Sequence, residues 1–290
     1  MALLEELIHP LTLQEFSEQY LFKAPYAAHF KAQAMKELIS WPLLWEIFQT
    51  EHADCWLPKK GQLPPEPSLQ TGKLSFDQAR KGYEEGRTIL VRHAEKAHPK
   101  LAAIAEDFHQ LFQDPVDIQL YCTPPEEEGF DWHYDSEEVF VIQSGGEKEF
   151  RIRKNTVNPW PQHMRMPKNL QFEKEGPSPE IRCHLKAGDW LYIPSGWWHK
   201  ARALTPSFHL SVGVMALTGA GYFEALLSQL LEDPRWQQRL PMRRFAHSAS
   251  SQEFFKSLSQ HLATLLQDSN RFKEFSSKNP PKSVNSQIHF

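Results

Sequence analysis

The stretch Gly188-Asp189-Trp190-Leu191-Tyr192-Ile193-Pro194-Ser195-Gly196-Trp197-Trp198-His199 combines an apolar run with two turn signals. Gly188 is suited to a turn, and the apolar run that follows it has the composition of a buried strand. Pro194 and Gly196 then predict a tight turn. The chain that returns from this turn is expected to carry His199 inward. The stretch therefore predicts two adjacent strands with a histidine on the second.

The residues around this stretch alternate between apolar and polar with the period of two that is typical of strands. Turns rich in glycine or proline separate these segments, and no helix alternates with them as in a parallel α/β sheet. Residues 155–169 are expected to form a long loop. The pattern predicts a mainly β protein with flanking helices, built as a sandwich or a barrel. The expected strands are Val116–Thr123, Val139–Gln143, Lys148–Lys154, Glu180–Leu185, Asp189–Ile193 and Phe208–Ala216.

Helical patterns lie on both sides of the predicted strands. Thr12-Leu13-Gln14-Glu15 and Ser75-Phe76-Asp77-Gln78 have the spacing of a capping box, and Pro99–Phe112 is amphipathic. Apolar residues at helical spacing return in 222–231 and 251–266. The chain is accordingly divided into a helical lead-in (1–115), a barrel (116–217), a C-terminal helical region (218–276) and a flexible tail (277–290).

A second motif, Trp132-His133-Tyr134-Asp135, precedes the predicted strands of the barrel. On an extended chain residues i and i+2 point the same way, so His133 and Asp135 present an imidazole and a carboxylate to one point. A His-x-Asp pair alone is unspecific. With His199, however, it provides the two imidazoles and one carboxylate that hold non-haem Fe(II) with open coordination positions, although zinc accepts the same ligands.

Composition narrows the classes of function. The formal net charge of -4 and the pI near 6.4 argue against a surface built to bind nucleic acid. The sequence contains no apolar run long enough to span a membrane, and residues 1–6 do not resemble a signal peptide. The three cysteines lie far apart and are expected to be reduced thiols. These features predict a cytoplasmic protein without a membrane partner.

The two motifs carry a resemblance to a known family. The G-x5-P-x-G-x2-H spacing that ends at His199 resembles the second cupin motif, with a departure at Ala203, where cupins have a further ligand. The stretch from His133 to Lys148 resembles the JmjC-type Fe(II)- and 2-oxoglutarate-dependent oxygenases, in particular the asparaginyl hydroxylases and the ribosomal oxygenases. This resemblance spans roughly residues 8–230. It implies a double-stranded β-helix (cupin, jelly-roll) and Fe(II), 2-oxoglutarate and dioxygen as reactants.

The resemblance also implies roles for residues. His133, Asp135 and His199 match the catalytic metal ligands of the family, and Lys148 matches its Lys or Arg that pairs with the distal carboxylate of 2-oxoglutarate. A buried cation suits that carboxylate. The hydroxyl of Thr123 or of Tyr121 is expected to bind the same carboxylate group. His209 and Ser211 are either part of this pocket or a satisfied pair that lines the barrel.

The implied activity is hydroxylation of a C–H bond in a protein, a peptide or an amino-acid-like molecule, with succinate and CO2 as co-products. Ribosomal oxygenases carry dimerising helices and a further domain. Roughly seventy residues follow the barrel here, which predicts a homodimer through the C-terminal helices and leaves the substrate open. The competing hypothesis is a non-oxidative metal cupin, either an isomerase or a sensor of small ligands, in which Lys148 neutralises a carboxylate of the core.

Overall fold

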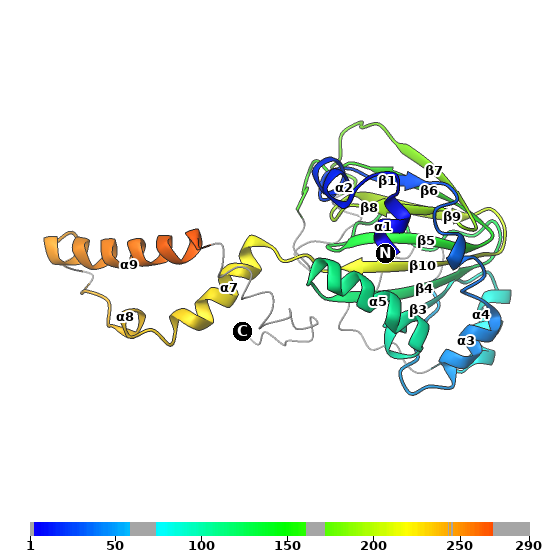
Figure 1. The fold of residues 1–290 in the computed structure, drawn as a ribbon, viewed down its shortest axis with the longest axis horizontal. Coiled ribbons are helices and arrows are strands. Elements are labelled where there is room, and N and C mark those ends of the chain that lie inside the picture. Colours follow the sequence, from blue (N-terminus) through cyan, green and yellow to red (C-terminus); the bar gives the residue numbers. More distant parts are fainter. Residues whose placement is uncertain (1–2, 59–73, 161–171, 243, 245, 269–290) are drawn as a thin grey trace. The chain divides into compact units, whose positions relative to one another are not determined.

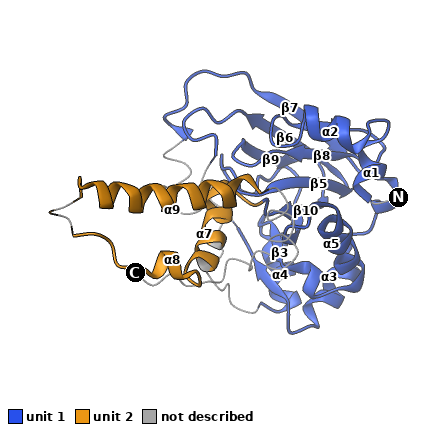
Figure 2. Ribbon diagram, turned by 60° about the vertical axis from the view of Figure 1, so that its left-hand side comes forward, with its two compact units in different colours: residues 1–216 blue, residues 217–290 orange. Residues whose placement is uncertain are grey.

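The computed structural model describes residues 3–58, 74–160, 172–242, 244 and 246–268 (Figure 1). The chain forms two compact units, residues 1–216 and residues 217–290 (Figure 2). Most of the predicted loop at 155–169, and all of the predicted tail at 277–290, lie outside the described residues. Within the described part of the chain, no helix is long and apolar enough to cross a membrane.

Unit 1 contains two antiparallel sheets, as expected for a double-stranded β-helix (Figure 1). The larger sheet has seven strands in the order β1-β8-β5-β10-β4-β3-β2, and the smaller has the order β7-β6-β9. The predicted mainly β fold is therefore confirmed. The barrel strands are β4 (Val116–Thr123), β5 (Glu138–Gly145), β6 (Glu147–Arg153), β7 (Ile181–Lys186), β8 (Trp190–Ile193), β9 (Trp198–Ala203) and β10 (Ser207–Val214).

The larger sheet is buried on both faces. Along β5, Val139 and Val141 pack in the core between the two sheets, whereas Phe140 and Ile142 pack in the core that the sheet forms with the helices. Side chains of a strand alternate between faces, so a strand that is covered on both sides is apolar throughout. These helices are α1 (Leu3–Ile8), α2 (Leu13–Gln19), α3 (Trp41–Phe48), α4 (Phe76–Glu84) and α5 (Pro99–Phe112).

The lead-in, residues 1–115, was predicted to be helical, but it also contains strands. It contributes three strands to the larger sheet: β1 (Tyr26–Ala28), β2 (Asp54–Trp56) and β3 (Ile89–Arg92). The alternation rule could not find them because β1 and β2 have three residues each and every residue of β3 is buried. Two short 3-10 turns, η1 (Gln33–Met35) and η2 (Ala94–Lys96), complete the lead-in.

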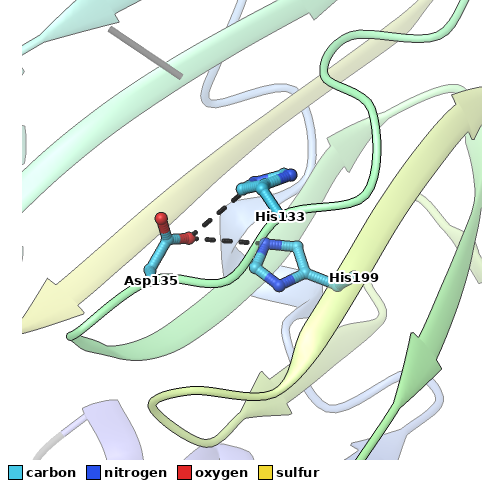
Figure 3. Close-up of side chains that lie close together, drawn as sticks. All are labelled: His133, Asp135 and His199. Carbon is cyan, nitrogen blue, oxygen red and sulfur yellow. Dashed lines mark ion pairs between the residues drawn. The ribbon is translucent and has the colours of Figure 1, made fainter. Parts of the chain in front are cut away.

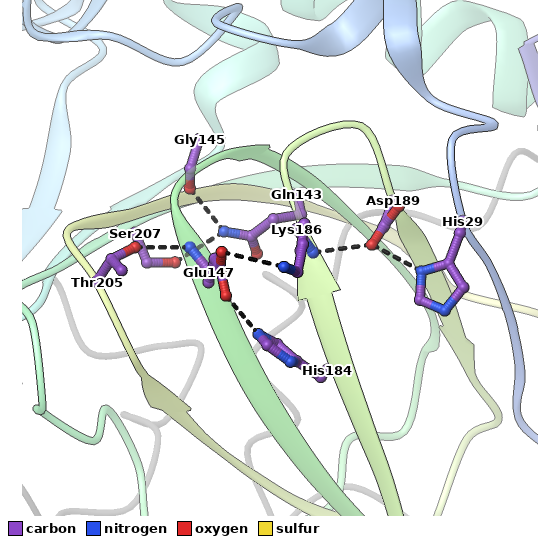
Figure 4. A network of polar contacts seen from close by, with 9 residues as sticks. All are labelled: His29, Gln143, Gly145, Glu147, His184, Lys186, Asp189, Thr205 and Ser207. Carbon is purple, nitrogen blue, oxygen red and sulfur yellow. Dashed lines mark hydrogen bonds and ion pairs between the residues drawn. The ribbon is translucent and has the colours of Figure 1, made fainter.

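Asp189 ties the lead-in to the turn between β7 and β8 (Figure 4). Its carboxylate accepts hydrogen bonds from the backbone N–H groups of Phe30 and Lys186, both at 2.9 Å, and pairs with His29 Nδ1 at 2.9 Å. The preceding Gly188 has φ +94°, a conformation that favours glycine, as its predicted place in a turn requires. The turn thereby holds β1 beside β8.

Unit 2 is helical, with α7 (Gly219–Leu230), α8 (Pro234–Gln237) and α9 (Ala249–Gln267). Its small core consists of Leu226, Leu230 and Leu265, with Leu262 and Trp236 packed against them. Asp233 caps α8 by accepting a hydrogen bond from the N–H of Arg235.

Candidate metal centre

The loop before β5 and the start of β9 bring the three predicted ligands together. His133 and His199 form an antiparallel bridge, with backbone hydrogen bonds of 3.2 Å and 2.8 Å in the two directions. The turn before β9 adds a third bond, from the N–H of Gly196 to the carbonyl oxygen of Asp135, at 2.8 Å. Gly196 has φ +79°, which fits its predicted place in a tight turn.

The three side chains converge on one point (Figure 3). Asp135 Oδ2 lies 3.9 Å from His133 Nε2 and 3.4 Å from His199 Nε2. One potential ligand atom from each residue, a ring nitrogen of each histidine and a carboxylate oxygen of Asp135, lies within 4.8 Å of the other two. A single metal ion between them could therefore contact all three residues. Both imidazoles are buried and the carboxylate is partly exposed, which leaves one side of the triad accessible.

Hydrogen bonds to the backbone determine which nitrogen of each imidazole carries the proton. His133 Nδ1 lies 2.7 Å from the carbonyl oxygen of Asp131, and His199 Nδ1 lies 3.0 Å from that of Trp197. A carbonyl oxygen only accepts, so each Nδ1 must carry the proton. In the neutral rings the Nε2 lone pairs then face Asp135. Metal-binding histidines are oriented in the same way, so the triad fits a divalent metal ion.

Lys148 lies on β6 and is 2 % exposed. Its Nζ donates to Thr123 Oγ1 at 3.0 Å and contacts His209 Nδ1 at 3.3 Å. Burial lowers the pKa of Lys148 to about 7. Among the described residues no carboxylate pairs with this ammonium group, so it does not neutralise a carboxylate of the core. A buried cation of this kind favours an anionic ligand.

The hydroxyls of Thr123 and Tyr121 have different partners. Thr123 is fully buried beside Lys148, and its Oγ1 also accepts a hydrogen bond from Thr88 Oγ1 at 3.2 Å. The Tyr121 hydroxyl instead donates to Gln119 Oε1 at 2.8 Å. The Tyr121 ring stacks on His209, with 4.6 Å between the ring centroids. Thr123 is therefore the better placed of the two to share an anionic ligand with Lys148.

His209 is part of this cluster rather than a separate lining residue. Burial, together with the Lys148 charge, keeps the pKa of His209 well below its usual range, so the ring is neutral. Nδ1 therefore accepts the hydrogen bond when Lys148 is protonated. On the same strand, Ser211 pairs with Gln119 of β4.

A polar row that was not predicted from the sequence continues from Tyr121 along β4. Gln119 Nε2 donates to Asp117 Oδ2 at 3.1 Å, and Asp117 Oδ1 pairs with His93 Nδ1 at 2.5 Å. The hydrogen bond with Asp117 is the main reason that the pKa of His93 is raised. The alternation of side chains along a strand could have predicted this row, because residues 117, 119, 121 and 123 share one face of β4. Glu95 lies near this pair and accepts the N–H of Ile118 at 3.0 Å.

The two sheets, with a His-x-Asp pair and a second histidine on adjacent segments, define a cupin-type double-stranded β-helix with a metal-binding triad. Residues 92–222 match the family model of the JmjC domain. This match covers somewhat less than half of the chain, and it confirms the resemblance to the JmjC-type oxygenases that the motifs predicted.

Two curated relatives are similar to this chain over most of its length. Ribosomal oxygenase 2 of Bos taurus is 26 % identical over 239 residues, which cover 77 % of this chain and 49 % of the relative. The bifunctional lysine-specific demethylase and histidyl-hydroxylase NO66 of Drosophila persimilis is 25 % identical over 252 residues, with 83 % and 36 % covered. The chain thus spans half or less of the length of these two relatives.

Solved structures support the fold. The X-ray structure of Escherichia coli YcfD has a TM-score of 0.59 and 23 % identity, and the match covers 92 % of this chain and 72 % of that one. A structure of YcfD, described as a ribosomal oxygenase in complex with cobalt and 2-oxoglutarate, has a TM-score of 0.57 and 21 % identity, with 91 % and 69 % covered.

Proposed function

We propose that this protein is an Fe(II)- and 2-oxoglutarate-dependent hydroxylase. The observation that carries the proposal is the combination of a His133, Asp135, His199 triad with the buried ammonium group of Lys148 in one domain. A metal triad alone suits many cupins. A 2-oxoglutarate molecule, however, has one end that chelates a metal and a distal carboxylate that needs a cation, and the described residues offer both.

The residues of the chain would bind and orient the reactants. His133, Asp135 and His199 would hold the iron on one side, leaving coordination positions open on the other. Lys148 and Thr123 would hold the distal carboxylate of 2-oxoglutarate, with Lys148 kept in place by the neutral ring of His209. When bound, iron, 2-oxoglutarate and dioxygen supply the oxidation of a substrate C–H bond, with succinate and CO2 as co-products.

The affinity for 2-oxoglutarate should fall as the pH rises above about 7. Burial lowers the pKa of Lys148 to about 7 in the free protein, whereas a bound carboxylate favours the ammonium form and raises that pKa. Binding therefore takes up a proton above this pH, and the dissociation constant should increase by up to about tenfold per pH unit. Below it Lys148 is already charged and the affinity should level off.

Calorimetry on the Mn(II)-saturated protein between about pH 6 and about pH 9 measures this slope. The variant Lys148→Arg is the control, because arginine stays charged over the whole range and should give a flat profile. A slope that is the same in both proteins would assign the pH dependence to other groups.

We propose a protein side chain as the substrate. The names of the relatives, ribosomal oxygenase and histidyl-hydroxylase, support a ribosomal protein in particular, and such a substrate would place the protein in the cytoplasm. The name of the second relative also includes lysine demethylation. That reaction begins with hydroxylation of a methyl group and needs the same site.

The function is tested by incubating the purified protein with Fe(II), 2-oxoglutarate and a set of ribosomal proteins in air. We expect succinate to form in step with a mass increase of one oxygen atom in one of them. Loss of a methyl group would identify a demethylase. If 2-oxoglutarate is never consumed, with or without these proteins, the non-oxidative cupin replaces the proposed function.

We also propose a homodimer that forms through unit 2. On α7 and the residue that follows it, Phe223, Leu227 and Leu231 are exposed and spaced four residues apart, so they form one stripe along the helix. Leu226 and Leu230 face the core of the unit. A stripe of exposed apolar residues beside a small core is typical of a surface that is covered by a partner.

Light scattering after size exclusion tests the dimer. We expect the mass of two chains for the wild type and of one chain for the double variant Leu227→Glu/Leu231→Glu. The matched control is Leu240→Glu, which changes an exposed leucine outside the stripe. A monomeric wild type, or a double variant that stays dimeric, would exclude this interface.

A further inference from the structure

Glu138 is a buried carboxylate, close in sequence to His133 and Asp135, that the proposed chemistry does not use. It is the first residue of β5, three positions after Asp135, and it is 2 % exposed. The Tyr192 hydroxyl donates to Glu138 Oε2, and the N–H of Ser195 donates to Glu138 Oε1 at 3.3 Å. Burial is the main reason that the pKa of Glu138 is raised to about 7. A buried carboxylate is costly, so its partners matter.

Tyr192 and Ser195 lie on the segment of β8 and the following turn that leads to His199 on β9. Ser195 belongs to the turn between β8 and β9, and Gly196 of the same turn donates to the carbonyl oxygen of Asp135 at 2.8 Å. The turn is thus bonded to the His133-x-Asp135 segment through the carbonyl oxygen of Asp135, and to β5, the strand after that segment, through Glu138. Tyr192 extends the connection, because its hydroxyl also accepts the N–H of Phe22 in the lead-in at 2.9 Å.

We propose that Glu138 is a positioning residue of the metal centre, which holds the turn before His199 against the strand that follows His133 and Asp135. This inference rests on the proposed metal site. The carboxylate accepts one hydrogen bond on each oxygen, so it fixes Ser195 and Tyr192 at the same time. Residues that only orient metal ligands contribute to affinity because the ligands are then held in place before the metal binds.

The variant Glu138→Gln tests the proposal, since it keeps the size of the side chain but leaves a single acceptor oxygen for two donors. At about pH 8, where the wild-type carboxylate is mostly ionised, calorimetric titration with Mn(II) should show an affinity reduced by about 10- to 100-fold. The melting temperature of the metal-free protein is measured in parallel. A merely structural role would lower that temperature and leave the metal affinity of the folded protein unchanged.

The matched control is Asp189→Asn, which neutralises another buried carboxylate of unit 1 that accepts backbone hydrogen bonds, at the turn between β7 and β8 and outside the triad. Its Mn(II) affinity should equal that of the wild type. If Glu138→Gln does not fold, Tyr192→Phe removes one of the two hydrogen bonds and should weaken Mn(II) binding to a smaller extent. Unchanged affinity in the folded variant, or an equal loss in Asp189→Asn, would overturn the proposal. A wild type that binds no Mn(II) would instead contradict the proposed metal site.

Discussion

Replacing His199 by alanine should weaken Fe(II) and Mn(II) binding by more than about 100-fold, because losing a residue that merely orients a ligand already costs about 10- to 100-fold. His199 contributes one of only two imidazoles in the triad, and its free Nε2 lies 3.4 Å from Asp135 Oδ2. Consumption of 2-oxoglutarate should stop with it. Metal affinity by calorimetry and succinate production by mass spectrometry measure the two effects.

His184→Ala is the matched control for this variant. His184 lies on β7, is exposed, pairs with Glu147 (Figure 4) and does not belong to the triad. It should retain both metal binding and turnover. Retained metal binding in His199→Ala, or an equal loss in His184→Ala, would contradict the assignment of the metal centre.

Replacing Lys148 by alanine should weaken 2-oxoglutarate binding by about 2–5 kcal/mol, as for other truncated partners of buried charge pairs. This corresponds to a dissociation constant that is about 30-fold to about 5,000-fold higher. The physical reason is that the distal carboxylate would be buried beside Thr123 without a cation. Metal affinity should stay the same, because Lys148 does not belong to the triad. Calorimetry with the Mn(II)-loaded protein separates the two affinities.

Three further variants make this experiment specific. Thr123→Val removes one neutral hydrogen bond and should cost about 1 kcal/mol. Tyr121→Phe should change 2-oxoglutarate affinity by less than about twofold, because its hydroxyl donates to Gln119. Lys186→Ala, in an exposed pair with Glu147, should have no effect. An unchanged affinity in Lys148→Ala, or a larger loss in Tyr121→Phe than in Thr123→Val, would refute this description of the pocket.

Short sequence patterns correctly predicted those helices and strands whose ends are determined by neighbouring residues. Both capping boxes form, with Thr12 and Ser75 as the N-caps, and α5 and β4 have the predicted bounds. The spacing of the two metal motifs also led to the correct fold class. Each of these features depends on residues that are close in the sequence, so a single sequence is sufficient to predict them.

The remainder depends on contacts between distant segments. The three lead-in strands exist because they extend a sheet whose other strands lie up to about 160 residues away, as for Ala28 beside Trp190. Glu138 looks like an ordinary polar residue at the start of a strand, and only the fold shows that Tyr192 and Ser195 surround it. Similarly, which hydroxyl faces Lys148 depends on how β4 and β6 face each other.

Anaerobic titration of the purified protein with Fe(II), followed by 2-oxoglutarate, tests the central claim most directly. Chelation of Fe(II) by the keto acid gives a weak charge-transfer band in the visible range. We expect this band in the wild type, its absence in His199→Ala, and its appearance only at much higher 2-oxoglutarate concentrations in Lys148→Ala. If the wild type binds iron but shows neither the band nor affinity for 2-oxoglutarate, the protein is a metal-binding cupin of another kind.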